Sequence, residues 1–321
     1  MQEMTISGIH HITAIAGDPQ RNMDFYAELL GLRLVKLTVN FDDPGTYHFY
    51  FGNALGTPGS ILTFFPWAGV RRGNVGNGQV SATTFAVPMG SLGYWRERLP
   101  RSDTSVQEAV ERFGERVLGF SDPDGLPLEM VETTHSQCGQ WTGSPVPAEC
   151  GICGFHSATL SEEGYEKTAA LLHDVMGLRY VGKEDNRFRY RAPGDQPAAL
   201  VDVLCTPDRP LGRLGAGTVH HIAWRTPDDA RQLAWRKTLV DGGYNVSPVM
   251  DRTYFQSIYY REPGGVLFEI ATDPPGFALD EAPEHLGERL MLPPQFERHR
   301  TTVEQSLPRL TLPNQKQAVS R

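Results

Sequence analysis

The chain has 321 residues, of which 40% are hydrophobic and 21% are charged, a composition typical of a soluble globular protein. Its net charge of −8 argues against nucleic acids and anionic membranes as partners, because neither attracts an acidic surface. The sequence has no apolar run long enough for a transmembrane helix, and its N-terminus lacks the basic and apolar regions of a signal peptide. Four cysteines are too few to suggest a disulfide framework, so we expect a cytoplasmic protein.

Internal repeats divide the chain into four similar modules. A helix that ends at a glycine and runs into a strand occurs at 25–35 and returns at 170–181. A proline–glycine turn followed by a strand with one glutamate occurs at 122–129 and returns at 262–269. Each module should therefore contain a strand, an amphipathic helix and three short strands, a βαβββ unit. The expected modules span about 7–66, 79–133, 152–205 and 217–273.

The segment 134–150, with Gly, Ser, Pro and Gln, is interpreted as a linker between two halves. We expect one domain at 1–140, built from modules one and two, and a second at 150–280, built from modules three and four. A proline-rich tail at 281–321 follows, with a helix predicted around Pro294–Ser306. The fold class predicted from this pattern is α+β.

Two of the four modules open with a pair of histidines on the first strand, namely His10-His11 and His220-His221. Adjacent residues of a strand point to opposite faces, so only one histidine of each pair should reach a common centre. An aspartate lies seven residues after the second histidine of each pair, and this spacing selects His11 and His221. The two aspartates are Asp18 and Asp228.

Glu269 lies among apolar residues on the last strand of module four. Together with His11 and His221 it makes a two-histidine, one-carboxylate set, which can hold a divalent iron and leave coordination positions free. A lone histidine on a strand is more often a core or surface residue than a ligand. Three ligand-type residues at matched positions of separate repeats favour a metal site instead.

Several motifs together resemble the vicinal-oxygen-chelate superfamily, which includes glyoxalase I, bleomycin-resistance proteins and extradiol dioxygenases. They are the His-His-Ile-Thr opening and the segments Tyr47–Gly52, Gly56–Ser60, Gly217–His221 and Leu292–Pro294. Within the superfamily they are most similar to ring-cleaving dioxygenases that act on hydroquinones rather than catechols. The resemblance covers essentially the whole chain and implies that paired βαβββ modules form two half-barrel units.

In this fold, two first-strand and two last-strand residues face the centre of a half-barrel. The resemblance implies that modules one and four supply His11, His221 and Glu269, and the remaining last-strand position is Thr63. Threonine is a poor metal ligand, so three protein ligands should remain. This number leaves room for both a substrate and oxygen.

The resemblance also implies roles for five residues around the metal. Arg252 should orient the substrate, and Tyr259 should donate a hydrogen bond to its metal-bound phenol oxygen. His10, His220 and Thr13 should orient the ligands or pass protons. The alternatives from residue type alone are a surface salt bridge for Arg252 and a core aromatic ring for Tyr259.

Modules two and three should form a pseudo-symmetric second half-barrel. Glu129 and His156 are its candidate ligands, but Ala82 stands where His221 stands in module four, so we expect a structural half without a metal. The pair Cys150 and Cys153 has no partner pair, and we interpret it as incidental rather than as a zinc site.

The sequence therefore predicts an Fe(II)-dependent dioxygenase, with Mn(II) as the alternative metal. Its partners should be a small aromatic substrate (a hydroquinone or a related dihydroxylated ring) and O2, and a homo-oligomer is compatible with the sequence. One rival is a glyoxalase I-like isomerase with Ni or Zn, whose usual fourth ligand is absent at Thr63. Another is a metal-free binding protein of the resistance type, which would not need the three ligands.

Overall fold

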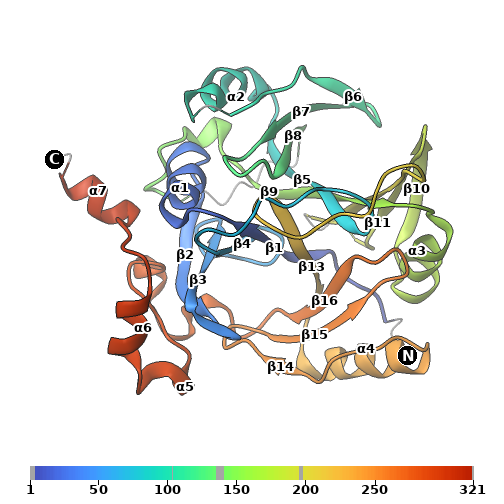
Figure 1. The fold of residues 1–321 in the computed structure, drawn as a ribbon. Coiled ribbons are helices and arrows are strands. Elements are labelled where there is room, and N and C mark those ends of the chain that lie inside the picture. Colours follow the sequence, from blue (N-terminus) through green and yellow to red (C-terminus); the bar gives the residue numbers. More distant parts are fainter. Residues whose placement is uncertain (1–3, 103, 135–140, 195–197, 320–321) are drawn as a thin grey trace.

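The computed structural model of the protein describes residues 4–102, 104–134, 141–194 and 198–319 (Figure 1). The first module consists of β1 (Ile9–Ala16), α1 (Pro19–Met23), the π-helical segment η1 (Asp24–Leu29), β2 (Arg33–Asn40), β3 (Asp43–Gly52) and β4 (Ile61–Pro66). The second consists of β5 (Gln79–Pro88), α2 (Leu92–Arg98), the 3-10 turn η2 (Leu99–Ser102), β6 (Val110–Arg112), β7 (Glu115–Ser121) and β8 (Pro127–Thr133).

The third module consists of β9 (Gly154–Glu162), α3 (Glu166–Ala170), the π-helical segment η4 (Leu171–Val175), β10 (Arg179–Glu184), β11 (Arg187–Arg191) and β12 (Leu200–Cys205). The fourth consists of β13 (Thr218–Thr226), α4 (Asp229–Asp241), β14 (Met250–Asp251), β15 (Gln256–Arg261) and β16 (Leu267–Thr272). The four predicted βαβββ units are therefore confirmed.

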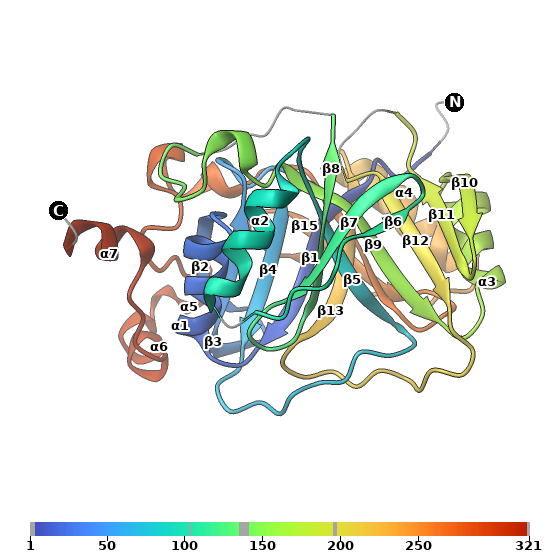
Figure 2. The same cartoon turned by 90° about the horizontal axis from the view of Figure 1, so that it is seen from above.

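Within the described residues the strands form two eight-stranded sheets that curl into half-barrels (Figures 1 and 2). The order β14-β15-β16-β13-β1-β4-β3-β2 joins modules one and four, and the order β10-β11-β12-β9-β5-β8-β7-β6 joins modules two and three. This arrangement confirms the α+β fold class and the predicted pairing of modules. Each sheet takes strands from both halves of the chain, so neither sheet corresponds to one of the expected domains 1–140 and 150–280. The division into these two domains stays a prediction.

The first strands of two paired modules lie antiparallel at the centre of each sheet. In the first sheet β1 pairs with β13, and each is flanked in parallel by the last strand of its own module, β4 or β16. All eight residues of β1 are buried, as expected of a central strand covered on both faces. Three neighbouring strands therefore carry the predicted ligands, one ligand on each of β1, β13 and β16.

The two aspartates that follow the histidine pairs begin helices. Asp18 is the N-cap of α1, where its Oδ1 accepts a hydrogen bond from the backbone N–H of Arg21 at 2.8 Å. Asp228 is the N-cap of α4 and binds the N–H of Arg231 in the same way at 2.8 Å. The seven-residue spacing thus records a strand of fixed length followed by a helix start.

The linker and the tail pack against the first module. Residues 135–140 of the predicted linker 134–150, with Cys138, lie outside the described residues. Further along the linker, Ser144 Oγ donates to the carbonyl oxygen of Gly31 at 3.0 Å, next to the short 3-10 turn η3 (Ala148–Cys150). Cys150 and Cys205 are free thiols, whereas Cys153 is disulfide-bonded, so Cys150 and Cys153 are not bonded to each other.

The helix predicted around Pro294–Ser306 is present but is broken into two at Arg298 and His299. The 3-10 turn η5 (Phe277–Leu279) precedes the tail, which consists of the 3-10 turn η6 (Pro283–His285) and the helices α5 (Pro294–Glu297), α6 (Arg300–Ser306) and α7 (Pro313–Val319). No helix in the described part of the chain is long and apolar enough to cross a membrane.

A buried lysine anchors the tail, which lies beside β2 and β3 (Figure 1). Lys36 of β2 has no exposed surface, and its Nζ pairs with Asp280 Oδ1 at 2.6 Å and with Glu281 Oε2. Next to this ion-pair cluster, Leu37 forms a parallel bridge with Leu290. A lysine without solvent needs such partners because an unpaired buried charge is costly. The start of the tail is therefore a fixed part of the first half-barrel.

Candidate metal centre

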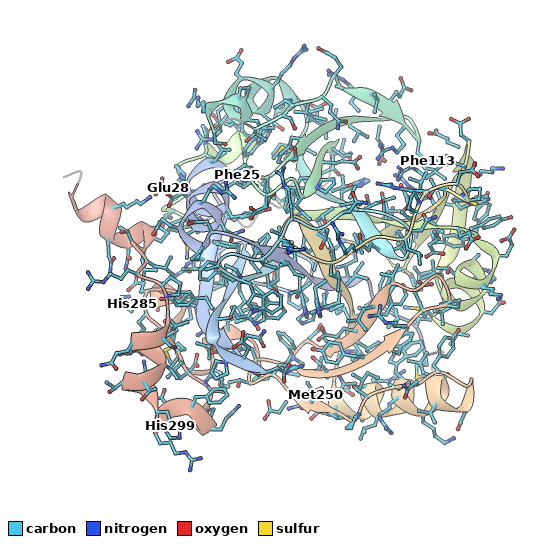
Figure 3. The ribbon with its side chains drawn as sticks, in the orientation of Figure 1. Phe25, Glu28, Phe113, Met250, His285 and His299 are labelled. Carbon is cyan, nitrogen blue, oxygen red and sulfur yellow. The ribbon has the colours of Figure 1, made fainter. Side chains whose placement is uncertain are left out.

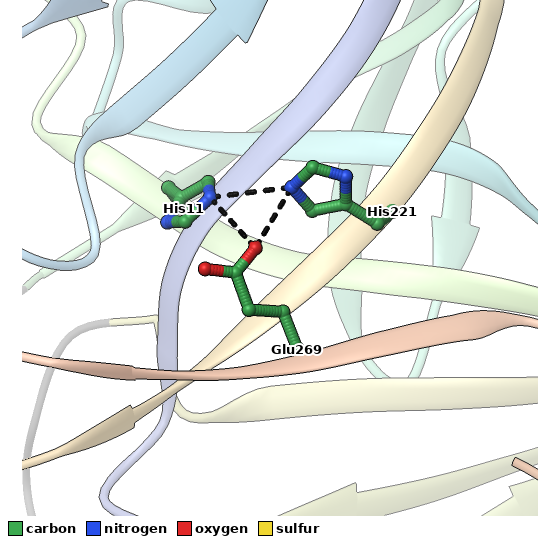
Figure 4. Close-up of side chains that lie close together, drawn as sticks. All are labelled: His11, His221 and Glu269. Atoms are coloured by element: carbon green, nitrogen blue, oxygen red, sulfur yellow. Dashed lines mark hydrogen bonds and ion pairs between the residues drawn. The ribbon is translucent and has the colours of Figure 1, made fainter. Parts of the chain in front are cut away.

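His11, His221 and Glu269 meet inside the half-barrel of modules one and four (Figure 4). The Nε2 atoms of His11 and His221 lie 3.4 Å apart. Glu269 Oε2 lies 2.9 Å from His221 Nε2 and 3.4 Å from His11 Nε2. All three side chains are buried. Within the described residues, no other three His, Cys, Asp or Glu side chains meet closely enough to hold a metal ion.

The donor atoms of this group fit a divalent metal ion. Glu269 Oε1 accepts a hydrogen bond from Ser257 Oγ, but the buried Oε2 accepts none, although it faces both imidazole rings. A buried carboxylate oxygen without a partner is costly. A cation between the three side chains would satisfy Oε2 and both ring nitrogens at once, and two imidazoles with one carboxylate suit Fe(II) and related metals.

Burial and the contacts between the side chains set the protonation states of Glu269 and His221. Burial alone would raise the pKa of Glu269, but His11 and His221 lower that pKa well below its ordinary value. Burial also lowers the pKa of His221. At neutral pH the centre therefore contains an ionised carboxylate and a neutral His221, which are the protonation states that metal ligands require.

A β-bulge lies beside each ligand histidine. The register between β1 and β13 shifts once at His10 and once at His220, which leaves each as an extra residue in the ladder. As a result, Nδ1 of His10 lies 2.9 Å from Nδ1 of His11, and Nδ1 of His220 lies 2.8 Å from Nδ1 of His221. The strict alternation of faces that we expected for these pairs does not hold, because the bulges bring the paired rings together.

With a metal ion bound, these contacts would fix the tautomers of four rings. If His11 and His221 present Nε2 lone pairs to a metal, each carries its proton on Nδ1 and donates it to the neighbouring Nδ1. His10 and His220 then accept at Nδ1. Burial lowers the pKa of His10 well below its ordinary value and that of His220 to about 3, so both rings are neutral acceptors at neutral pH.

A cavity of about 280 Å³ opens beside the three side chains. Four of the five predicted catalytic residues line it: Thr13, His220, Arg252 and Tyr259. His10 is not among the lining residues and lies behind His11. Much of the remaining wall is aromatic, with rings contributed by Phe41, Tyr50, Phe65, Trp67 and Phe255. The cavity thus combines a metal-type centre with walls suited to a flat apolar ring.

Arg252 and Tyr259 contact each other at one side of the cavity. Arg252 Nε donates to the Tyr259 hydroxyl at 3.2 Å, and its Nη1 lies 3.5 Å from Asp42 Oδ2. The Tyr259 ring packs edge-on against His221, with centroids 5.7 Å apart. Burial, followed by the nearby Glu269 charge, raises the pKa of Tyr259, so its hydroxyl keeps its proton.

Thr63 occupies the predicted fourth position of the half-barrel. Thr63 pairs with Thr13, two residues after His11, just as Glu269 pairs with the residue two positions after His221. Its Oγ1 lies 2.8 Å from Thr13 Oγ1 and 2.9 Å from His48 Nε2. The hydroxyl is therefore occupied by two protein partners.

Sequence reasoning missed two residues at the site, Ser257 and Asp42, and also the contact of His48 with Thr63. Ser257 lies two residues before Tyr259 on β15, and His48 lies two residues before Tyr50 on β3. Because β15 and β3 are equivalent strands of modules four and one, aligning the modules strand by strand would have identified both positions. Asp42 belongs to a turn, and no repeat pattern indicated it.

The second half-barrel places different residues at the four equivalent positions. By the register of β5 with β9 and of each with its last strand, they are Ala82, Ser157, Glu129 and Asp202. His156 is the extra residue at the bulge of β9 and corresponds to His10 rather than His11. The interpretation of His156 as a ligand-position residue is therefore wrong by one residue of register, and Asp202 was not recognised.

Arginines neutralise the carboxylates of the second half-barrel. Arg112 binds both oxygens of Glu129, at 2.8 and 3.0 Å. Arg189 Nε donates to Asp202 Oδ1 at 2.8 Å, and Arg187 Nη1 donates to Asp202 Oδ2 at 3.1 Å. These bidentate and shared contacts occupy the carboxylates that could otherwise bind a cation.

The turn after β6 closes this half-barrel against β10 and β11. Phe113 is labelled in Figure 3. The guanidinium of Arg189 lies 4.1 Å from its ring centroid, and the Phe113 backbone N–H donates to Glu184 at 2.7 Å. His156 Nε2 is 2.9 Å from Glu115 Oε1. His156 therefore belongs to a hydrogen-bond network with Glu115.

Two half-barrels of paired βαβββ modules, with a buried His-His-Glu group on three central strands that suggests a metal site, define a fold of the vicinal-oxygen-chelate type. A family model described as Glyoxalase/Bleomycin resistance protein/Dioxygenase superfamily matches residues 8–130 and 154–270. The chain belongs to this superfamily.

Similar proteins cover nearly the whole chain. MhqO of Bacillus subtilis, a candidate ring-cleaving dioxygenase, is 55% identical over 300 residues, which are 94% of this chain and 95% of that protein. The chlorohydroquinone/hydroquinone 1,2-dioxygenase of Sphingobium indicum is 39% identical over 302 residues, which are 91% of this chain and 93% of that enzyme. These similarities confirm the predicted resemblance, and the chain belongs to the same group of enzymes.

Solved structures agree with this assignment. A crystal structure of a candidate dioxygenase from Bacillus subtilis, 54% identical, matches with a TM-score of 0.93 over 97% of this chain and 99% of that one. Glyoxalase I from Zea mays matches with a TM-score of 0.60 at 13% identity, over 83% of this chain and 92% of that one. The maize enzyme shares the fold alone.

Proposed function

We propose that this chain is an Fe(II)-dependent dioxygenase that opens the ring of a hydroquinone, or of a related dihydroxylated aromatic compound, and inserts both atoms of O2. The observation that carries the proposal is a buried set of three protein ligands beside an aromatic-lined cavity, with a non-ligating threonine at the fourth position. The ring-cleaving relatives, among them a hydroquinone dioxygenase, support the substrate class.

The ligand set would hold iron through His11 Nε2, His221 Nε2 and Glu269 Oε2. Bound there, iron would supply a binding site for a phenolate and the activation of O2. The protein's own contribution begins with orientation, because Ser257 holds Glu269, and the neighbouring histidines hold both ligand rings.

Tyr259 and Arg252 would act on the oxygen of the ring nearest to the centre. Tyr259 keeps its proton because its pKa is raised, so its hydroxyl can donate a hydrogen bond to a phenolate oxygen. Arg252 donates to the Tyr259 oxygen, which orients the hydroxyl and places a positive charge near the developing anion. His220 lines the cavity as a neutral ring and can hold or pass a proton at Nε2.

The aromatic wall would exclude water and hold the ring flat. Phe255 packs 5.0 Å from the His11 ring, and Phe65 packs edge-on against His220 at 5.9 Å. Exclusion of water strengthens the hydrogen bonds of Tyr259 and Arg252 to an anionic oxygen.

The two rival functions are less well supported. A glyoxalase-like centre would use a fourth protein ligand, whereas the Thr63 hydroxyl is occupied by Thr13 and His48. A metal-free binding protein would not need His11, His221 and Glu269 to meet at one buried point. The cytoplasmic location, the homo-oligomer and the choice of iron over manganese stay predictions.

The decisive experiment is anaerobic loading with Fe(II), followed by oxygen-uptake assays on hydroquinone, catechol and the hemithioacetal of methylglyoxal. Hydroquinone should consume O2 and give a ring-opened acid. Turnover of the hemithioacetal alone, without O2 uptake, would replace this proposal with the isomerase function. Tight binding without any reaction would favour the binding-protein function.

Metal content tests the ligand assignment separately. The variants His11→Ala, His221→Ala and Glu269→Ala should each lose the one divalent ion per chain and keep the fold. His156→Ala is the matched control in the other half-barrel and should keep its metal. Full metal content in any of the three ligand variants would contradict the assignment.

A further inference from the structure

A hydroquinone presents a recognition problem that a catechol does not. The two oxygens of a catechol are adjacent and can both approach one metal ion. The oxygens of a hydroquinone lie at opposite ends of the ring, so only one can reach the centre. The second oxygen must find a polar partner elsewhere in the cavity, because a buried hydroxyl without a hydrogen bond is costly.

Most polar side chains in the cavity wall already have partners. Asp43 Oδ2 accepts from Thr46 at 2.7 Å and from Trp67 Nε1 at 3.0 Å. Asp42 faces Arg252, and Thr13 is bound to Thr63. These groups hold the wall together and are not free for a ligand without breaking a contact.

One ring nitrogen of His48, Nδ1, is available to bind a ligand. Its Nε2 lies 2.9 Å from Thr63 Oγ1, whereas its Nδ1 has no hydrogen-bond partner among the described residues. The ring packs against Tyr50 and Phe65, with centroids 4.0 and 4.4 Å away, so it is held in place while it lines the cavity. Burial lowers the pKa of His48 well below its ordinary value, so the ring is neutral.

His48 and Tyr259 line the cavity from opposite arms of the half-barrel, where an arm means the strands toward one end of the curled sheet. His48 lies on β3, second from one end of the sheet, and Tyr259 lies on β15, second from the other end. Both side chains line the same cavity. A ring with one oxygen near Tyr259 therefore extends toward the arm that carries His48.

Hydrogen bonds connect Thr13, Thr63 and His48 in a row, and their direction decides whether His48 Nδ1 is a donor or an acceptor toward a ligand. If Thr13 donates to Thr63 and Thr63 donates to Nε2, then Nδ1 carries the proton and donates to the cavity. If the chain runs the other way, Nε2 donates to Thr63 and Nδ1 accepts from the cavity. The distances of 2.8 and 2.9 Å suit both directions.

We propose that His48 Nδ1 binds the second oxygen of the ring and thereby selects para-dihydroxylated substrates. The inference rests on the proposed function and deepens it, since it names the group that separates hydroquinones from catechols. A reversible hydrogen-bond chain serves this role well, because the second oxygen can be recognised as a hydroxyl that donates or as a carbonyl that accepts.

The test measures equilibrium binding of hydroquinone, phenol and catechol to the Fe(II)-loaded protein without oxygen. The wild type should bind hydroquinone about tenfold more tightly than phenol, the size of one good hydrogen bond. His48→Phe keeps a ring against Tyr50 and Phe65 but removes both nitrogens. It should bind hydroquinone and phenol equally, with the affinity for phenol and the metal content unchanged within about twofold.

A second variant and a control separate the nitrogen from the shape of the cavity. His48→Leu should show the same loss of preference, so a result common to both variants arises from the missing nitrogen. His156→Leu, in the other half-barrel, should keep the wild-type preference. The proposal is overturned if the His48 variants still prefer hydroquinone, or if their affinities for phenol and hydroquinone fall together.

The same measurements distinguish this inference from the proposed function. If binding prefers hydroquinone through His48 but no O2 is consumed, the proposed reaction fails and the role of His48 stands. If hydroquinone consumes O2 and the preference for it does not depend on His48, the reaction stands and the role of His48 fails.

Discussion

Ser257→Ala removes the hydrogen bond that orients the carboxylate of the candidate metal centre. Ser257 Oγ donates to Glu269 Oε1, and both side chains have no exposed surface. The substitution opens little space, because alanine differs from serine by one oxygen. It leaves Oε1 without its donor and frees the carboxylate to rotate away from His11 and His221.

Two magnitudes follow from this geometry. A hydrogen bond to a charged group is worth about 1.5–3 kcal/mol, so the metal-free protein should lose about that much of its free energy of unfolding. Removing a partner that orients a metal ligand costs about 10–100-fold in metal affinity. Unfolding by denaturant checks the first value, and competition with a chelator under anaerobic conditions checks the second.

Ser161→Ala provides the matched control. Ser161 is also fully buried, in β9 of the other sheet, and donates to Asn77 Oδ1 at 2.9 Å. Its loss should lower stability without changing metal affinity. If Ser257→Ala and Ser161→Ala lose similar stability and both bind metal as the wild type does, then Ser257 supports the fold alone and our reasoning about Glu269 is refuted.

Three further predictions concern the hydroxyl of Tyr259 and two buried ionisable side chains, Lys36 and Glu162. Tyr259→Phe should keep its metal and lose about 10²-fold in turnover, and unchanged kinetics would remove Tyr259 from the mechanism. Lys36→Met should lose about 3–5 kcal/mol in denaturant unfolding, because two carboxylates lose their buried partner, and a smaller loss would show that water replaces the lysine. Burial, and then Glu262, raises the pKa of Glu162 from 4.5 to about 8, so folding favours its protonated form and stability should fall as the pH rises from 4.5 to about 8. Glu162→Gln should remove this loss, so that melting temperatures at pH 6 and 8.5 differ less than in the wild type.

The repeats made the fold predictable, and with it the three side chains that meet in the first half-barrel. Strand lengths fix the spacing between a first-strand histidine and the helix N-cap that follows it, as at Asp18 and Asp228. A turn glycine fixes the position of Glu269 in the same way. These are local constraints, and they can be read from one strand at a time.

The remaining parts of the site depend on contacts between strands. The bulges at His10 and His220 arise from the pairing of β1 with β13, which no local pattern encodes. A similar bulge in β9 made our placement of His156 wrong by one residue. An error of one residue in a strand changes which side chain faces the centre. Asp202 escaped notice because its spacing differs: Gly194 of the preceding proline–glycine pair stands eight residues before Asp202, whereas Gly265 stands four residues before Glu269.

The tail shows a second limit of sequence patterns. Its helices follow from local signals, but its attachment depends on Lys36, which a sequence would place on the surface. The lysine is buried only because Asp280 and Glu281 arrive from a segment more than two hundred residues further on. Such a pair is visible only once the fold is known.

The pairing of modules one and four has a consequence for how the protein is made. The two ligand histidines are separated by 210 positions in the chain. During synthesis β1 emerges from the ribosome long before β13, so one of its edges stays unpaired, and β5 likewise awaits β9. An unfinished chain with open edges is prone to wrong association, and contacts between distant segments form slowly. Because His221 and Glu269 are made late, the proposed metal site is complete only after β13 and β16 have joined β1 in the first sheet.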